Sequence, residues 1–212
     1  MMLNKRDKAI IRDLNKFRVM DRDSIAELHF KGLKNPERSA NNVLLRLLRD
    51  GEIQRSTSYT PYLYFGPDVT IKKDSQKCRH FLGILEVYKE VRKYEALESF
   101  RVEPKYGKKG TVEPDVYMYF RNTPFFLEIQ KSIYSEKQMK EKLARYINLF
   151  HREIIAKPFP HVLILSEQRY ALDEDYPFKV FQAESFTSFL NALRSVKKPK
   201  QVKSSGIKMR IG

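Results

Sequence analysis

The stretch between Asn35 and Asp50 constrains the fold most strongly, because its apolar residues recur at helical spacing. Asn35 is a good N-cap, Pro36 suits the first position of a helix, and Asp50-Gly51 provides a stop. The apolar positions form one wide stripe, made of Ala40, Val43, Leu44, Leu47 and Leu48. We therefore expect a helix over 36–49 that buries this stripe in a core.

The sequence around this helix predicts two more helices and a hairpin. They are a helix over 5–17, a short helix capped by Asp21 or Asp23, and strands over 52–56 and 62–65 around a polar tip at 57–61. Three helices followed by a hairpin is the winged-helix pattern. Residues 44–55 resemble the recognition helix running into the wing in many bacterial regulators. The resemblance implies that residues 1–66 form a winged helix-turn-helix domain that binds double-stranded DNA.

The polar side of the helix over 36–49 supplies the candidate base-reading residues. If the apolar stripe faces the core, four side chains project away from it: Arg38, Asn41, Asn42 and Arg46. Arg and Asn suit guanine and adenine edges in the major groove. Arg55 and Tyr59 would lie on the wing, near the DNA backbone or the minor groove. The alternatives are an ordinary solvated surface and a wing that contacts a second copy of the chain.

The formal net charge of +15 is concentrated at the two ends of the chain. Residues 1–66 carry 13 basic and 8 acidic side chains, and residues 197–212 carry 6 basic and no acidic ones. A polyanionic partner is the simplest explanation, because each Lys or Arg placed against a phosphate releases a counterion. The alternative is a basic protein without such a partner. The segment 197–212 is predicted to be a disordered basic tail.

Cysteine usage and hydropathy bear on the compartment. Cys78 is the only cysteine, so no internal disulfide can form, which fits a reducing environment. No apolar run approaches the ~18 residues that a membrane-spanning helix needs. We expect a cytoplasmic protein with no membrane partner.

The second half of the sequence alternates helices and strands in a pattern typical of an α/β (α+β) domain with a mixed central sheet. A linker is expected over 67–79 and this domain over 80–196. Its expected elements, in chain order, are a helix over 80–95, strands over 99–103, 112–120 and 125–130, a helix over 135–152, strands over 161–166 and 179–182, and a helix over 185–196.

Two carboxylates on neighbouring strands form the most specific motif of this domain. With 121–124 as the turn, Asp115 faces Gln130, and side-chain alternation puts Glu128 on the same side of the sheet. Two carboxylates a diagonal step apart can hold a divalent cation, Mg²⁺ or Mn²⁺. Such an ion could polarise a phosphate and lower the pKa of an attacking water. If Lys142 balances the two charges instead, the site is inactive and needs no cofactor.

The stretches Glu113-Pro114-Asp115 and Glu128-Ile129-Gln130 resemble the motifs of PD-(D/E)XK nucleases. The family usually has Lys where this chain has Gln130. Lys142 and Tyr146, one helical turn apart, resemble the Gln-x-x-x-Tyr element of RecB-like nucleases. The resemblance implies a catalytic set completed by a helix acid, which is Glu86 or its alternative Glu90: Asp115, Glu128, Gln130, Lys142, Tyr146 and Glu86.

The combination of the two halves, over residues 5–66 and 80–166, resembles the replication-relaxation proteins of Gram-positive plasmids and mobile elements. This resemblance implies a DNA-binding protein of a plasmid, phage or mobile element that acts in replication or relaxation. Its nuclease-like domain can be degenerate. Two alternatives stay open: a Mg²⁺-dependent nickase, and a transcription regulator that dimerises through its second domain. The expected partners besides DNA are a second copy of the chain and other replication proteins.

Overall fold

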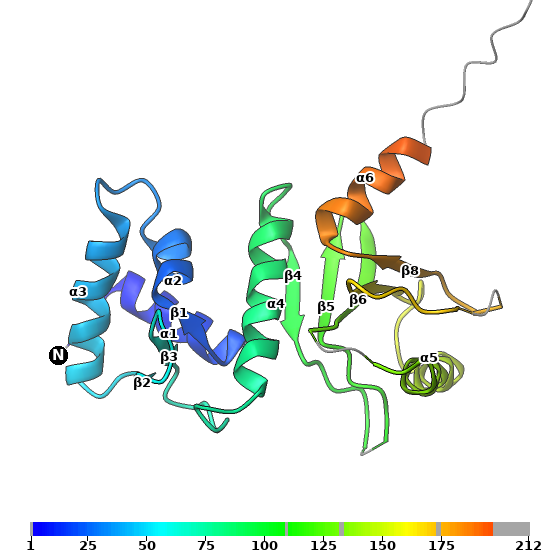
Figure 1. The fold of residues 1–212 in the computed structure, drawn as a ribbon, viewed down its shortest axis with the longest axis horizontal. Coiled ribbons are helices and arrows are strands. Elements are labelled where there is room, and N and C mark those ends of the chain that lie inside the picture. The colour runs from blue at the N-terminus through cyan, green and yellow to red at the C-terminus, as the bar shows by residue number, and fades with distance from the viewer. Residues whose placement is uncertain (1, 109, 132–133, 173–174, 197–212) are drawn as a thin grey trace, which may run out of the picture.

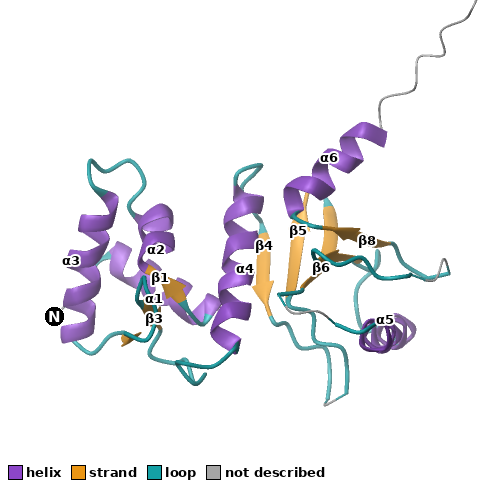
Figure 2. Cartoon of the chain, viewed as in Figure 1, coloured by secondary structure: helices purple, strands orange, loops and turns teal. Residues whose placement is uncertain are grey.

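A computed structural model describes residues 2–108, 110–131, 134–172 and 175–196. The predicted basic tail, 197–212, lies outside these residues. The described chain contains six helices and two sheets, so the predicted mixture of helices and strands is confirmed (Figures 1 and 2). No helix among the described residues is long and apolar enough to cross a membrane.

Residues 2–66, the N-terminal module, contain three helices and a small antiparallel sheet. The helices are α1 (Lys5–Phe17), α2 (Arg22–His29) and α3 (Pro36–Arg49). Strands β1 (Met20–Asp21), β2 (Gln54–Ser56) and β3 (Leu63–Phe65) pair in the order β1-β3-β2. The predicted caps are confirmed, because Asp21 accepts from Ser24 N and Asn35 accepts from Arg38 N. The strand β1 was not predicted, since a two-residue strand leaves no periodic signal.

Residues 77–196, the C-terminal module, are built on a mixed five-stranded sheet in the order β4-β5-β6-β7-β8. The first three strands are antiparallel and the last three are parallel. The elements, in chain order, are α4 (Lys77–Arg92), β4 (Ser99–Val102), β5 (Val116–Phe120), β6 (Thr123–Ile129), α5 (Glu136–His151), β7 (His161–Leu165), β8 (Val180–Ala183) and α6 (Phe186–Val196).

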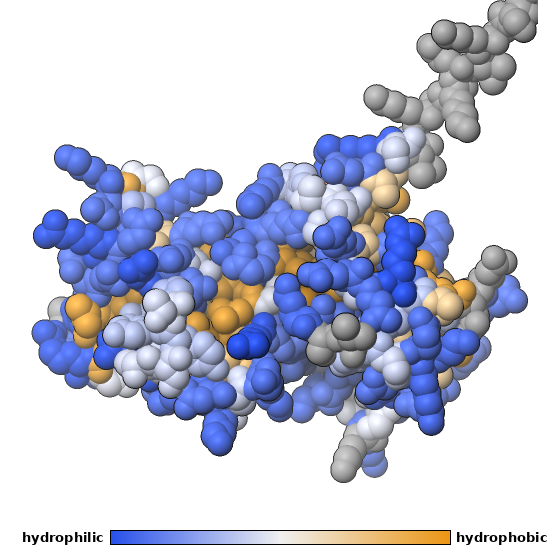
Figure 3. All heavy atoms as spheres, in the orientation of Figure 1, coloured by the Kyte–Doolittle hydropathy of each residue, from blue (hydrophilic) through white to orange (hydrophobic). Residues whose placement is uncertain are grey.

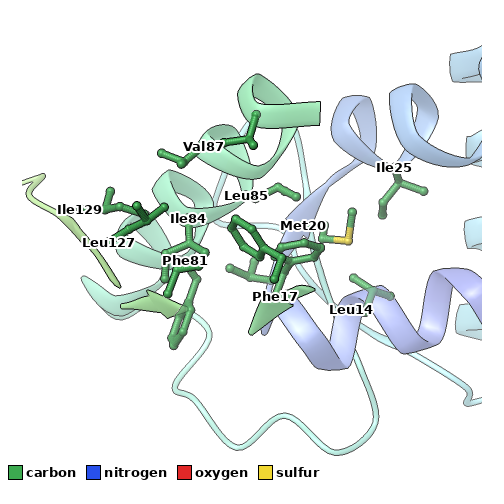
Figure 4. Packing of buried hydrophobic residues seen from close by; sticks show 14 of the residues in the cluster. Leu14, Phe17, Met20, Ile25, Phe81, Ile84, Leu85, Val87, Leu127 and Ile129 are labelled. Carbon is green, nitrogen blue, oxygen red and sulfur yellow. The ribbon is translucent and has the colours of Figure 1, made fainter. Parts of the chain in front are cut away.

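The sheet separates two layers of helices. Helices α4 and α6 pack on one face, and α5 covers the other (Figure 1). Figure 4 shows α4 between the two modules, with Phe81 and Ile84 toward β6 and Leu85 toward Met20 of β1. A single cluster of buried apolar residues therefore runs through both modules. On the face that Figure 3 shows, the surface is mostly hydrophilic, with apolar atoms visible near α4.

The segment between the modules is shorter than the linker predicted over 67–79. Helix α4 begins at Lys77, and Cys78 is fully buried in the shared core. The Cys78 thiol lies 3.2 Å from the carbonyl oxygen of Lys73. The chain therefore enters the C-terminal module earlier than its polar composition suggested.

The predicted turn between β5 and β6 is wrong by two residues. The strands are joined by Arg121 and Asn122 alone, both at positive φ (47° and 58°), and Phe120 pairs with Thr123 rather than Phe125. A shift of two residues leaves every side chain on the face assigned to it, because strand side chains alternate with a period of two. Asp115 and Glu128 therefore share one face of the sheet, as predicted, despite the wrong register, whereas Gln130 lies beyond the end of β6.

Candidate functional site

One side of α3 is exposed along its whole length. The side chains on it follow helical spacing and are Arg38, Asn42, Leu45 and Arg49. In Figure 1, α3 lies at the end of the molecule away from the sheet of the C-terminal module. We call these four residues the α3 face. Among the described residues, Arg38 makes no ion pair, and Arg49 pairs with its neighbour Asp50 at 3.2 Å.

Two predicted members of the DNA-reading set are placed differently from the expectation. Arg46 does not project away from the protein, because its Nη2 lies 2.6 Å from Oδ1 of Asp7. Asp7 is only 1% exposed, and a buried carboxylate requires a partner. Asn41 is half-buried on the flank of the helix. Arg46 therefore joins α3 to α1, and the outward positions are those of Leu45 and Arg49.

The wing between β2 and β3 also differs from the expectation in one residue. Arg55 lies over the ring of Tyr62, 4.8 Å from its centroid. Tyr59 is half-buried and packs against the core, whereas Tyr62 is exposed. Side chains alternate between the two faces of a hairpin, so the register of β2 and β3 would have identified Tyr62 as the exposed tyrosine beside Arg55.

Asp115 and Glu128 face each other across β5 and β6. The register pairs Val116 with Leu127, and its continuation sets Asp115 opposite Glu128. Both side chains lie under α5, on the sheet face of Phe126. The exposed fractions are 9% for Asp115 and 1% for Glu128, so neither carboxylate is open to solvent.

Helix α5 supplies two partners to the buried Glu128. A capping box at Ser135 and Gln138 fixes the start of the helix, and Met139, Leu143 and Leu149 anchor it to the sheet. The Tyr146 hydroxyl donates to Oε1 of Glu128 at 2.5 Å, and the Lys142 ammonium forms an ion pair with Oε2. Lys142 and Tyr146 reach the same carboxylate because they are one turn apart.

The charges of this cluster perturb one another. Burial and the nearby Asp115 raise the pKa of Glu128 to about 7, against the opposing effect of Lys142. Burial disfavours the Lys142 ammonium, but the carboxylates of Glu128 and Asp115 outweigh it and raise the pKa of this lysine. Burial and Glu128 raise the pKa of Tyr146 well above its ordinary value, so the phenol stays a hydrogen-bond donor.

The carboxylate oxygens of this pair already have partners within the chain. Asp115 Oδ2 accepts from the backbone N–H of Ile129 at 2.6 Å, and Oδ1 lies 3.5 Å from Nε2 of His80. Both oxygens of Glu128 are engaged by Lys142 and Tyr146. Among the described residues, no group of three His, Cys, Asp or Glu side chains is close enough together to hold a metal ion. The lysine ammonium supplies the positive charge that a cation would bring.

The structure does not bring the remaining predicted site residues to this pair. Helix α4 packs on the opposite face of the sheet, where Glu86 contacts Lys89 at 2.8 Å. Glu90 accepts from the backbone N–H of Thr187 at 2.8 Å and so caps α6. Gln130 and Glu86 line a cavity of about 540 Å³ that Asp115 and Glu128 do not line. The α4 residue near the pair is His80, which motif spacing gave no reason to select.

Comparisons with known proteins are sparse. No family model matches the chain, and no curated protein matches it significantly. Among solved structures, the chain is similar to Can2 from Sulfobacillus thermosulfidooxidans in complex with cyclic tetra-adenylate, at 10% identity and a TM-score of 0.39. The match covers 90% of this chain and 52% of Can2, so the chain spans about half the length of that protein. A likeness at this level supports no conclusion about function.

Proposed function

We propose that this protein binds duplex DNA through a winged-helix N-terminal module. The α3 face enters the major groove, and Arg55 and Tyr62 of the wing lie near the DNA backbone. The observation that carries the proposal is the exposed row of Arg38, Asn42 and Arg49 on the outermost helix. Arginine and asparagine can each donate hydrogen bonds to base edges, and the basic module is attracted to phosphates.

We further propose that the C-terminal module is a PD-(D/E)XK-like fold that serves as a platform without cutting DNA. Catalysis by such a site requires carboxylate oxygens that can bind a cation and reach a phosphate. Here Glu128 is buried and engaged by Lys142 and Tyr146. The Lys142 ammonium balances the charge of the Glu128 carboxylate, so the fold of this module does not depend on a metal ion.

The biological setting is proposed from the sequence resemblance alone. Replication-relaxation proteins act on plasmid or mobile-element DNA, and the same role is proposed here, in replication or its regulation. Dimerisation through the C-terminal module would place two α3 faces on one operator, as a regulator requires.

A binding assay on the full chain tests the DNA-binding proposal. The triple variant Arg38→Ala, Asn42→Ala, Arg49→Ala should bind a mixed-sequence duplex at least about tenfold more weakly than the wild type. A matched control replaces two arginines and one asparagine that are exposed on α5 and α6: Arg145, Asn148 and Arg194. Equal losses in the two triple variants would show that net charge, and not the α3 face, determines binding.

A plasmid assay tests the platform proposal. Supercoiled plasmid incubated with the wild type and Mg²⁺ or Mn²⁺ should stay supercoiled. Nicking by the wild type that disappears in Asp115→Asn would overturn the platform and support the nickase alternative. The DNA-binding result stands independently of this outcome.

A further inference from the structure

Leu45 is the one apolar side chain of the α3 face. It is 57% exposed, although the apolar stripe on the other side of the same helix is buried at Ala40, Leu44 and Leu47. An exposed leucine contributes nothing to the core of its own module, so its position says nothing about folding. A lone exposed leucine needs no partner of its own, but Leu45 lies in the middle of the polar row of the α3 face, where a bound molecule would meet it.

The neighbours of Leu45 define the chemistry of that contact. Asn42 lies three residues before it and Arg49 four residues after it, so a polar side chain adjoins it on either side. Arg38 extends the row by another turn. A contact between protein copies requires a contiguous apolar area at its centre, which a single leucine among arginines does not provide. The charge of the row suits a polyanion.

Thymine presents a methyl group to the major groove, and the other bases present only hydrogen-bonding groups there. An apolar side chain in the middle of a groove-reading helix can therefore bury that methyl group, while its polar neighbours contact base edges. Leu45 has this arrangement, with amide and guanidinium groups one turn away on each side.

We propose that Leu45 contacts the C5-methyl group of a thymine and makes α3 select an A·T pair at the centre of its site. This inference rests on the proposed DNA-binding function and deepens it, since it names the base that the α3 face reads. Asn42 and Arg49 read the base pairs on either side of that thymine.

The test removes the methyl group from the DNA and the leucine from the protein. A duplex selected by the full chain from a random-sequence library is resynthesised with deoxyuridine in place of each thymidine in turn. Deoxyuridine lacks only the C5-methyl group. One replacement should weaken wild-type binding about fourfold, the value expected for one buried methyl-sized group. Leu45→Ala should weaken binding to the thymidine duplex and abolish the response to that same replacement.

Two control variants complete the design. Leu33→Ala removes another exposed leucine, 42% exposed in the loop before α3, and should keep the fourfold response. Arg38→Ala should bind more weakly but also keep it. Urea unfolding should be unchanged in Leu45→Ala, because the side chain is exposed.

The failures of the two proposals are distinguishable. If the library yields no bound duplex, the DNA-binding proposal fails and this inference fails with it. If the duplex is bound but wild type and Leu45→Ala respond equally to deoxyuridine, only the assignment of Leu45 is overturned. A third outcome assigns Leu45 to a contact between two copies of the chain. In that case the wild type sediments as a dimer and does not respond to deoxyuridine, and Leu45→Ala sediments as a monomer.

Discussion

The two modules hold their polar and charged side chains in opposite states. On the α3 face, Arg38, Asn42 and Arg49 extend into solvent on the outermost helix. In the C-terminal module, Glu128 is buried beneath α5 and forms an ion pair with Lys142 of that helix. An exposed group such as Arg38 can bind another molecule without losing a buried partner, and the ion pair of Arg49 with Asp50 is itself exposed to solvent. A buried group must first lose its partner inside the protein, and because the dielectric constant is low there, that loss costs free energy.

This difference explains why a motif alone does not define an active site. The paired carboxylates sit on the sheet face that the motif predicted, yet Lys142 and Tyr146 occupy the oxygens of Glu128. The row on α3 matches no catalytic motif, yet its side chains are exposed on the outermost helix. Substitutions at the two places separate a structural cluster from a free surface.

The largest effect is expected from breaking the buried ion pair. Lys142→Met leaves Glu128 and Asp115 without their counter-charge and should lower the free energy of unfolding at pH 8 by about 3–5 kcal/mol. Adding Glu128→Gln should recover part of that loss, because the more deeply buried of the two uncompensated charges is then gone. Lys137→Met, at an exposed position of the same helix, is the control. If urea unfolding gives equal stabilities for Lys142→Met and Lys137→Met, the cluster is not structural.

The raised pKa of Glu128 predicts a specific pH dependence. The folded-state pKa is about 7 and the ordinary value is 4.5, so the folded protein binds this proton more tightly than the unfolded chain. The contribution of Glu128 is therefore most favourable below pH 4.5 and declines as the pH rises to about 7. Relative to Glu128→Gln, the wild type should lose on the order of 3 kcal/mol over this window.

Urea titrations of both proteins across that range measure the difference directly. The Gln variant cancels the contributions of all other titrating groups. A wild type that gains stability relative to the variant as the pH rises would show that Lys142 dominates over burial.

The sequence predicted most elements and the faces of the sheet, because both depend on local periodicity. Helix α1 has the predicted bounds, and Asn35 caps α3 as its position before Pro36 suggested. Asp115 and Glu128 were assigned to one face with a turn two residues too long, and the assignment held because an even shift preserves alternation.

The partners of polar groups could not be predicted, because they join residues far apart in the chain. Arg46 and Asp7 are 39 positions apart, and only the packing of α3 on α1 brings them together. Periodicity assigns Arg46 to the flank of a helix but says nothing of a carboxylate buried beside it. His80 approaches Asp115 for the same reason, at a helix end that sequence placed only within a few residues.

Arg46 and Arg38 should separate stability from binding. Arg46→Ala leaves the buried Asp7 without its ion pair and should cost about 2 kcal/mol of stability. Arg38→Ala should leave stability unchanged and weaken DNA binding by ~1–3 kcal/mol if it reads a base edge. Urea unfolding and a fluorescence binding assay on the same two proteins give both values. A stable Arg46→Ala variant with weakened DNA binding would return Arg46 to the DNA-reading set.

The smallest expected effect lies where the two modules meet. The Lys16 ammonium of α1 lies 4.5 Å from the ring centroid of Tyr88 on α4, and Phe17 and Phe100 complete an aromatic cage around it. Burial lowers the pKa of Lys16, so the charge is partly desolvated and its attraction to the rings is stronger than in water.

A double-mutant cycle isolates this attraction from the packing that each side chain also provides. Lys16→Met and Tyr88→Leu keep most of the apolar volume, and the coupling between them should be about 0.5–1 kcal/mol in unfolding free energy. Lys8→Met, at an exposed position of α1, should show no coupling to Tyr88→Leu. Zero coupling for Lys16 would mean that only the shared apolar core holds the α1–α4 contact, and that the cage adds nothing to it.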